Sequence, residues 1–154
     1  MDTRRAWVLN LDADLELGVP PGYTPTNAVR LAMAPHVASL ATQLLGPGDV
    51  LVDERSPPRS ARGLPGRAFC PTPRAIALLK RAGAIPEPHP AVDVLRRVNS
   101  RAFATAMGAT LPGAAFVTDV GAARATIAQA PPVGEGWRIK HAFGMTGRDR
   151  KSVV

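Results

Sequence analysis

The chain has 154 residues, the length of one ordinary domain or of two small α/β units. Hydrophobic residues make up 45% of it and aromatic residues 5%, so we expect a globular core of alanine, valine and leucine. The single cysteine, Cys70, excludes an intrachain disulfide, and the apolar run Ala6–Leu9 is too short for a signal peptide or a membrane span. We therefore expect a cytoplasmic protein with no membrane contact.

The formal net charge is +7, and it is unevenly distributed. Residues 1–90 carry 10 basic and 8 acidic side chains, whereas residues 91–154 carry 9 basic and 4 acidic ones. Arginine accounts for 16 of the 19 basic residues, a bias that the base composition of a gene can produce. The charge alone is therefore weak support for a nucleic-acid partner.

Strands alternate with helices in the first half of the chain. A buried strand is predicted over residues 6–11; Asp12 and Asp14 are expected to end it in solvent, although two carboxylates there could also bind a cation. A helix follows over residues 27–45, with an interruption at Pro35, and then a strand within residues 49–54. Residues 55–67, rich in proline, arginine and glycine, are predicted to form a mobile, solvated loop, although they could also touch a polyanion.

A third short strand is predicted at residues 68–70, followed by a helix with clear start and stop signals. Thr72 is the predicted N-cap, Pro73 the first helical residue and Gly83 the stop after Arg81. This alternation of strands and helices indicates a small parallel α/β sheet. The proline-rich stretch 85–90 is the predicted linker, which gives two domains at residues 1–88 and 89–154.

The second half is predicted to begin with one helix over residues 91–107 and a strand at 114–118. A helix capped by Asp119 should run to about residue 130, followed by strands at 137–143 and 151–154. The last strand has no evident partner in the sequence, which leaves open that the chain packs against a missing lobe or another chain.

The strand at 137–143 carries the most informative pattern of the chain. Trp137, Ile139 and two further residues alternate on one side, while Arg138 and Lys140 share the other. Glycines at 144 and 147 would let the next turn bring backbone N–H groups close to a phosphate, beside the Lys140 ammonium. On this stretch alone, an ordinary hairpin with a solvated lysine is the favoured interpretation.

This second half resembles the opening of an ATP-grasp domain, over roughly residues 91–154. The residues that carry the resemblance are Val98–Phe103 on the helix, Leu111–Ala114 before the first strand, and Arg138–Arg148. The preceding α/β part resembles the Rossmann-like domain that usually stands ahead of ATP-grasp domains. The fold implied is a small Rossmann-like parallel sheet followed by an incomplete ATP-grasp N-terminal lobe.

The resemblance implies a nucleotide site. Lys140 would contact ATP near the adenine and the α-phosphate, and Arg101 would take the place of a second basic residue on the preceding helix. The loop would close over the β- and γ-phosphates through Gly144, Met145, Thr146 and Gly147. Members of the family use ATP and magnesium to convert a carboxylate into an acyl phosphate, which an amine or a thiol then attacks.

The magnesium ligands and the second lobe of such enzymes would lie beyond Val154. The remaining acidic residues of the second half, at 93, 119, 135 and 149, have no carboxylate partner at metal-ligand spacing, so no metal site is assigned. We therefore expect the front part of an ATP-dependent ligase, truncated and inactive alone. Its expected partners are a nucleotide and a missing lobe or a second copy, rather than nucleic acid.

Two alternatives concern the same loop. A Walker A motif is disfavoured because Arg150 stands where glycine should precede Lys151. An RNA-binding module is the second candidate function, because residues 144–147 form a GxxG that is followed by basic residues. A KH domain places its GxxG between two helices, whereas the flanks here are predicted to be strands.

Overall fold

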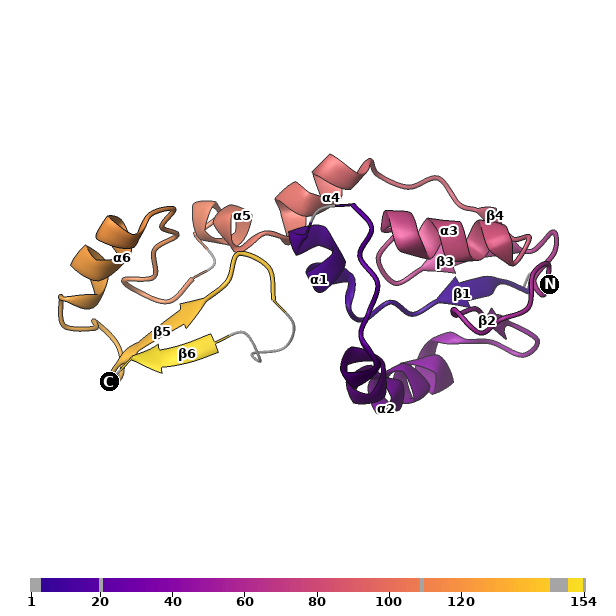
Figure 1. The fold of residues 1–154 in the computed structure, drawn as a ribbon, viewed down its shortest axis with the longest axis horizontal. Coiled ribbons are helices and arrows are strands. Elements are labelled where there is room, and N and C mark those ends of the chain that lie inside the picture. Colours follow the sequence, from indigo (N-terminus) through magenta and orange to yellow (C-terminus); the bar gives the residue numbers. More distant parts are fainter. Residues whose placement is uncertain (1–3, 20, 109, 145–149, 154) are drawn as a thin grey trace. The chain divides into compact units, whose positions relative to one another are not determined.

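The computed structural model describes residues 4–19, 21–108 and 110–144, together with the backbone of residues 150–153 (Figure 1). The chain divides into two compact units, Met1–Val92 and Asp93–Val154. The first unit contains a four-stranded sheet and the second a two-stranded one. The predicted mixed α/β class with a small parallel sheet is confirmed. No helix of the described part is both long enough and apolar enough to cross a membrane.

The sheet of the first unit is entirely parallel. Its strands are β1 (Ala6–Val8), β2 (Val50–Leu51), β3 (Pro65–Ala68) and β4 (Ile85–Pro86), in the order β2-β1-β3-β4. From β1 the chain continues to β2, which lies on one side of β1. From β2 it returns to β3, which lies on the other side of β1. The carboxyl ends of β1 and β3 therefore form the topological switch point, where ligands of open α/β sheets commonly bind.

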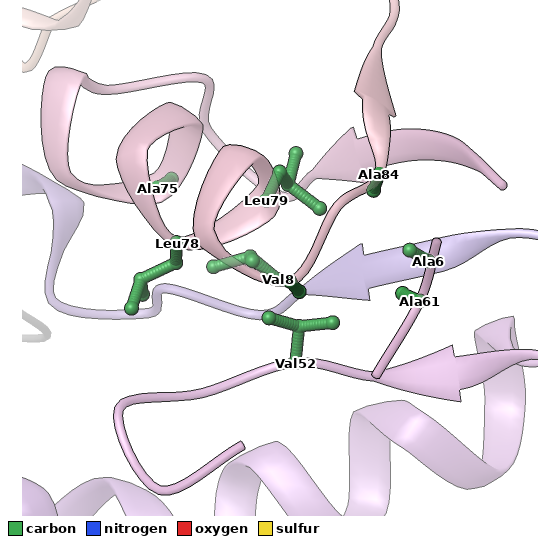
Figure 2. Close-up of a cluster of buried hydrophobic side chains, with 9 residues drawn as sticks. Ala6, Val8, Val52, Ala61, Ala75, Leu78, Leu79 and Ala84 are labelled. Atoms are coloured by element: carbon green, nitrogen blue, oxygen red, sulfur yellow. The ribbon is translucent and has the colours of Figure 1, made fainter. Parts of the chain in front are cut away.

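Three helices accompany this sheet: α1 (Ala13–Gly18), α2 (Asn27–Leu44) and α3 (Pro73–Arg81). The start of α3 is as predicted, because the Thr72 hydroxyl accepts a hydrogen bond from the Ala75 N–H and Pro73 is the first helical residue. Gly83 follows the helix with a φ of 75°. Figures 1 and 2 place α3 on one face of the sheet and α2 on the other.

The core lies between α3 and the sheet (Figure 2). Leu79 of α3 is fully buried, as are Ala6 of β1 and Ala75 of α3, and Val52 after β2 is 1% exposed. A Cβ on Gly66 would lie 3.1 Å from Cδ2 of Leu79, so glycine at this point of β3 lets the helix approach the strand closely. Small residues therefore set the separation of helix and sheet, and Leu79 fills it.

Four expectations for the first unit need correction. Helix α2 runs without interruption through Pro35, and α1 follows directly where the aspartates were expected to end a strand in solvent. Strand β3 begins at Pro65, three residues before the predicted strand. Residues 85 and 86, predicted as linker, form the edge strand β4; an edge tolerates Pro86 because its missing N–H costs no ladder bond there.

The second unit contains α4 (Val92–Asn99), α5 (Arg101–Ala106) and α6 (Val120–Ile127), followed by β5 (Trp137–Lys140) and β6 (Arg150–Val153). The two strands pair antiparallel over four positions, from Trp137 opposite Val153 to Lys140 opposite Arg150. The last strand therefore does have a partner, contrary to expectation.

Two further predictions for this unit are wrong. The single helix expected over residues 91–107 is broken at Ser100, whose hydroxyl accepts from the Phe103 N–H at 3.2 Å and so caps a new helix. Residues 114–118 form no strand. The Asp119 cap of α6 is confirmed, because its carboxylate accepts from the Ala122 N–H at 2.7 Å.

One carboxylate joins β1 to the loop before β2. Asp49 accepts hydrogen bonds from the Arg5 N–H at 2.7 Å, from the Trp7 indole at 3.0 Å and from the Gly46 N–H at 3.0 Å. Desolvation acts to raise the pKa of this carboxyl, but the two backbone donors and the indole outweigh it and hold the pKa below the ordinary value of 3.8. Asp49 in its charged form therefore stabilises the β1–β2 edge of the sheet.

Leu79→Ala should lower the free energy of unfolding by about 2–5 kcal/mol, because it leaves a cavity between α3 and the sheet. The matched control is Leu31→Ala on α2, where the side chain is 75% exposed, and there the change should stay within about 0.5 kcal/mol. Urea titrations followed by circular dichroism measure both. Equal effects of the two substitutions would contradict the assigned core.

Asp49→Asn should destabilise the protein at neutral pH, and the difference from wild type should disappear in acid. A depressed pKa stabilises the fold above the ordinary value of 3.8, and this contribution is lost as the pH falls through the lower, folded value. Urea midpoints of both proteins between neutral pH and acid test this. A difference that stays constant across that range would show that the charge of Asp49 is not involved.

Candidate functional site

Lys140 is the last residue of β5, and its side chain is exposed. The neighbouring Arg138 is also exposed, whereas Trp137 is half-buried and donates its indole N–H to the Gln129 carbonyl at 2.9 Å. The predicted apolar side of the strand is only partly covered, since Ile139 remains 45% exposed. Lys140 thus stands at the end of the strand from which the glycine loop departs.

Arg101, at the start of α5, is bound to the segment that directly follows β5. Its backbone N–H donates to the Ala142 carbonyl at 3.0 Å, and its guanidinium donates to the His141 carbonyl. Two hydrogen bonds from one residue therefore attach the N-terminus of α5 to the chain just beyond Lys140. The structure brings Arg101 to the beginning of the loop, as the predicted site requires.

Gly144 is the last described residue of the predicted phosphate loop, and it is half-buried. Met145, Thr146 and Gly147 lie outside the described residues, so their role in closing over phosphate stays a prediction. The loop as a whole connects the antiparallel strands β5 and β6. It therefore lacks the flanking helices of a KH-type GxxG.

A second polar site lies at the carboxyl edge of the four-stranded sheet. Asn10, two residues after β1, donates its amide N–H to the Cys70 carbonyl at 2.8 Å, and its amide oxygen accepts from the Cys70 N–H at 3.0 Å. This reciprocal pair joins the segments that leave β1 and β3. It fixes the two chains at the topological switch point.

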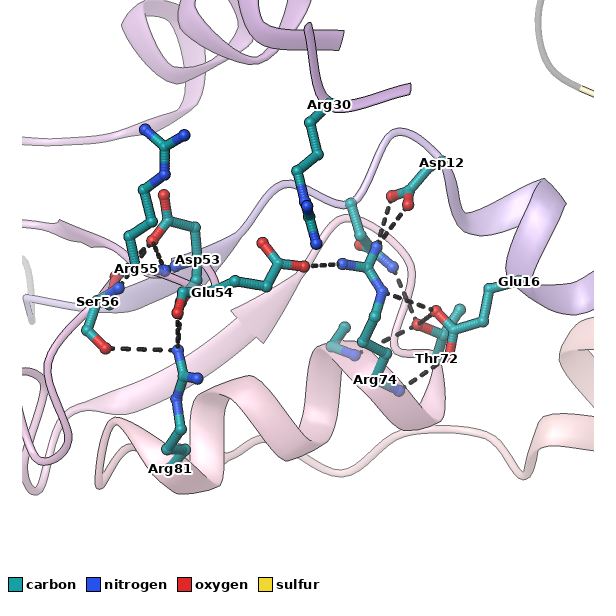
Figure 3. Close-up of polar contacts among 12 residues, drawn as sticks. Asp12, Glu16, Arg30, Asp53, Glu54, Arg55, Ser56, Thr72, Arg74 and Arg81 are labelled. Atoms are coloured by element: carbon teal, nitrogen blue, oxygen red, sulfur yellow. Dashed lines mark hydrogen bonds and ion pairs between the residues drawn. The ribbon is translucent and has the colours of Figure 1, made fainter. Parts of the chain in front are cut away.

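Arg74 of α3 is the centre of this second site, and three carboxylates surround its guanidinium (Figure 3). Its Nη2 lies 2.6 Å and 2.7 Å from the two oxygens of Asp12, its Nε lies 3.6 Å from Glu16, and its Nη1 is bound to Glu54. The side chains of Asp12 and Glu16 are only 8% exposed, and that of Arg74 is 16% exposed. The expectation of a solvated Asp12 is wrong: it is buried, and the cation that it binds is Arg74.

Glu16 of α1 caps the N-terminus of α3 from outside that helix. It accepts the Thr72 hydroxyl at 2.6 Å and the Arg74 N–H at 2.9 Å. The N-terminus of a helix is in general a favourable place for a phosphate to bind. A side chain of the protein itself occupies that position here, so the edge of the sheet is closed by internal contacts.

Two ionisable groups next to this network, the Tyr23 hydroxyl and the Cys70 thiol, are held in their neutral forms. Burial raises the pKa of the Tyr23 hydroxyl, and the nearby carboxylate of Asp12 raises it further. The ring of Tyr23 also lies 5.7 Å from the guanidinium carbon of Arg74, within cation–π range. Burial, with the charges of Asp14 and Glu16, raises the pKa of the Cys70 thiol. Neither group is therefore activated as a nucleophile at neutral pH.

Comparison with protein-family models, with curated proteins and with solved structures gives no match. Among the described residues, no three His, Cys, Asp or Glu side chains gather where they could hold a metal ion. The sequence reasoning missed Asn10, Glu16 and Arg74. The spacing of Asp12 and Glu16, four residues apart after a strand, was the available signal, because it places both carboxylates on one side of a helix start.

Arg74→Met should lower the free energy of unfolding by about 3–5 kcal/mol, because it leaves the buried carboxylates of Asp12 and Glu16 without a counter-ion. Adding Asp12→Asn and Glu16→Gln to that variant should recover part of the loss. The control is Arg30→Met, since Arg30 is exposed and its side chain, among the described residues, bonds to that of Asn27 alone. Thermal unfolding measures the stability of these variants. An Arg74→Met variant that is as stable as the control would contradict the role assigned to this network.

Proposed function

We propose that the second unit contributes to an ATP site of the ATP-grasp type and that the chain is the N-terminal portion of a carboxylate–amine or carboxylate–thiol ligase. The finer fold proposed with it is a Rossmann-like domain ahead of the first part of an ATP-grasp lobe. ATP with magnesium would be the cofactor. The described residues offer no group that could hold the metal, so the proposal concerns the nucleotide alone.

The attachment of Arg101 to the end of β5 is the observation that supports this proposal most. Hydrogen bonds to the carbonyls of His141 and Ala142 hold the first turn of α5 against the segment between Lys140 and Gly144. One short region thereby collects a lysine, an arginine and the first glycine of a loop between antiparallel strands. Arg101 comes about 40 residues before the other two in the sequence, and all three belong to the motifs on which the resemblance rests.

Each part of this region has a defined electrostatic role in the proposed site. The Lys140 ammonium would act as a point charge beside the α-phosphate, and the loop amides would receive the oxygens of the β- and γ-phosphates. Arg101 uses part of its guanidinium on the His141 carbonyl, so it would position the loop as well as add positive charge. Positioning and charge stabilisation are the main requirements of phosphoryl transfer.

The first unit is not assigned to the nucleotide. Glu16 occupies the N-terminus of α3, and three carboxylates surround the Arg74 guanidinium, so an incoming phosphate would meet negative charge there. The GxxG alternative gains no support from the flanks of the loop, which are strands rather than helices. Nucleotide binding by the second unit is therefore the function that these observations favour.

Lys140→Ala should abolish ATP binding by the chain, because it removes the ammonium that the strand presents beside the loop. Arg138→Ala is the matched control: it removes one positive charge from the same strand, two residues farther from the loop. Isothermal titration calorimetry with ATP, with and without magnesium, measures both affinities. We expect the control to stay within about threefold of wild type, which is less than 1 kcal/mol.

The proposal would be overturned by equal ATP affinity in wild type and Lys140→Ala. Equal losses in the two variants would also count against it, because they would point to net charge rather than to a particular ammonium. Titration with a labelled RNA distinguishes nucleotide binding from the second candidate function, which is RNA binding by the GxxG loop. RNA binding that depends on Lys140, without ATP binding, would favour the GxxG alternative.

A further inference from the structure

The cations of the first unit fall into two groups, according to whether the fold gives their side chains a partner. Six arginines are engaged, through contacts to carboxylates, carbonyl oxygens or an amide: Arg4, Arg5, Arg30, Arg67, Arg74 and Arg81. The other four described cations are exposed and form no side-chain hydrogen bond or ion pair with a described residue: Arg55, Arg59, Arg62 and Lys80. We call these four the arginine rim.

The arginine rim is confined to one part of the unit, the loop between β2 and β3 and the adjoining end of α3. Backbone bonds run from the N–H groups of residues 59, 61 and 63 to the carbonyls of residues 81, 82 and 83, at 3.1, 2.8 and 2.9 Å. A Cβ on Gly83 would lie 3.2 Å from the Cα of Arg62 and 3.4 Å from that of Arg59. The loop thus lies directly against the turn that follows Lys80.

The predicted exposure of this loop is confirmed, but backbone hydrogen bonds and a buried alanine hold it against the unit. Ala61 at its centre is 1% exposed and belongs to the core. Arg81 also donates to the carbonyls of Asp53 and Glu54, at 2.7 Å and 2.8 Å, and fixes the start of the loop (Figure 3). Arg59 is held at a φ of 64°, a conformation that non-glycine residues seldom adopt.

We propose that the arginine rim binds the phosphodiester backbone of a nucleic acid, independently of base sequence. Arginine forks match phosphate oxygens, and a firmly held loop loses little conformational entropy when its cations are engaged. The acidic side chains closest in sequence are already committed, Asp53 to the N–H groups of Arg55 and Ser56, and Glu54 to Arg74. Neither carboxylate pairs with a side chain of the rim, so its four cations can engage an external anion.

The composition of the loop favours nucleic acid over a lipid surface. Between residues 55 and 63 it contains arginine, serine, proline, glycine and one buried alanine, with no large apolar side chain that could enter a bilayer. It also contains no aromatic residue on which bases could stack, so recognition of particular bases is not expected. This inference is independent of the proposed ATP site, which lies in the other unit.

The test measures binding of the whole chain to a labelled single-stranded RNA and a labelled DNA duplex by fluorescence anisotropy. The rim variant combines Arg55→Gln, Arg59→Gln and Arg62→Gln, and it leaves Arg81 in place. We expect its affinity to fall at least about tenfold at low salt, and the slope of log affinity against log salt to decrease by about 2–3, as for three lost phosphate contacts.

The charge-matched control removes three exposed cations of the second unit: Arg97→Gln, Arg124→Gln and Arg138→Gln. It should stay within about threefold of wild type if the rim is the binding surface. Equal weakening of control and rim variant, or no binding by wild type at low salt, would overturn the proposal. The proposal would also be overturned if the protein bound vesicles of anionic lipid and excess RNA did not release it from them.

Circular dichroism and the melting midpoint establish that the rim variant is folded. If it is not, the pair Arg62→Gln and Lys80→Gln provides a second variant, which leaves the strained residue 59 unchanged. That pair should lower the salt slope by about 1–2. An unchanged slope in a folded pair variant would also overturn the proposal, whatever the outcome of ATP titrations.

Discussion

The first unit depends most on the ion pairs that the guanidinium of Arg74 forms with three carboxylates. Arg74 joins Asp12 after β1, Glu16 on α1 and Glu54 after β2, and its own N–H completes the Glu16 cap of α3. Segments that the sequence separates by 20 to 62 residues therefore meet at one side chain. Because two of the three carboxylates are buried, removal of this cation is costly, whereas the exposed ion pairs elsewhere contribute little.

The same network explains why the unit has the topology of a ligand-binding α/β sheet without an evident ligand site at its usual place. The switch point between β1 and β3 is present, but the Asn10–Cys70 pair joins its two sides, and Glu16 covers the adjoining helix N-terminus. Charge available for external partners lies elsewhere, near Lys140 in the second unit and on the arginine rim in the first. The two are chemically distinct: the first is an exposed lysine at the end of β5, and the second is three arginines of a firmly held loop with Lys80 of α3 beside them.

The sequence predicted those features that depend on local chemistry. The Thr72 and Asp119 caps follow from a side chain and the N–H three residues further on, and Pro73 at the start of α3 follows from its fixed φ and missing N–H; each is confirmed. Features that depend on distant partners were missed. The break at Ser100 was hidden because its apolar neighbours continue the helical pattern, and residues 85–86 become a strand only because β3 offers them backbone partners. The spacing of Asp12 and Glu16 could have indicated two carboxylates on one side of a helix start, but not their common partner Arg74, which only the sheet brings to them.

The parallel arrangement also has a consequence for how the chain acquires its structure during synthesis. β1 pairs only with strands at residues 50–51 and 66–68, so the first 49 residues have no strand with which it could form a sheet. The helix that covers these strands is complete only at Arg81. Until then the apolar segment from Ala6 to Leu9 lacks its native cover, and a ribosome adds about 5–20 residues per second. The apolar segment is therefore exposed for several seconds of synthesis, the kind of interval in which unpaired strands are prone to aggregate.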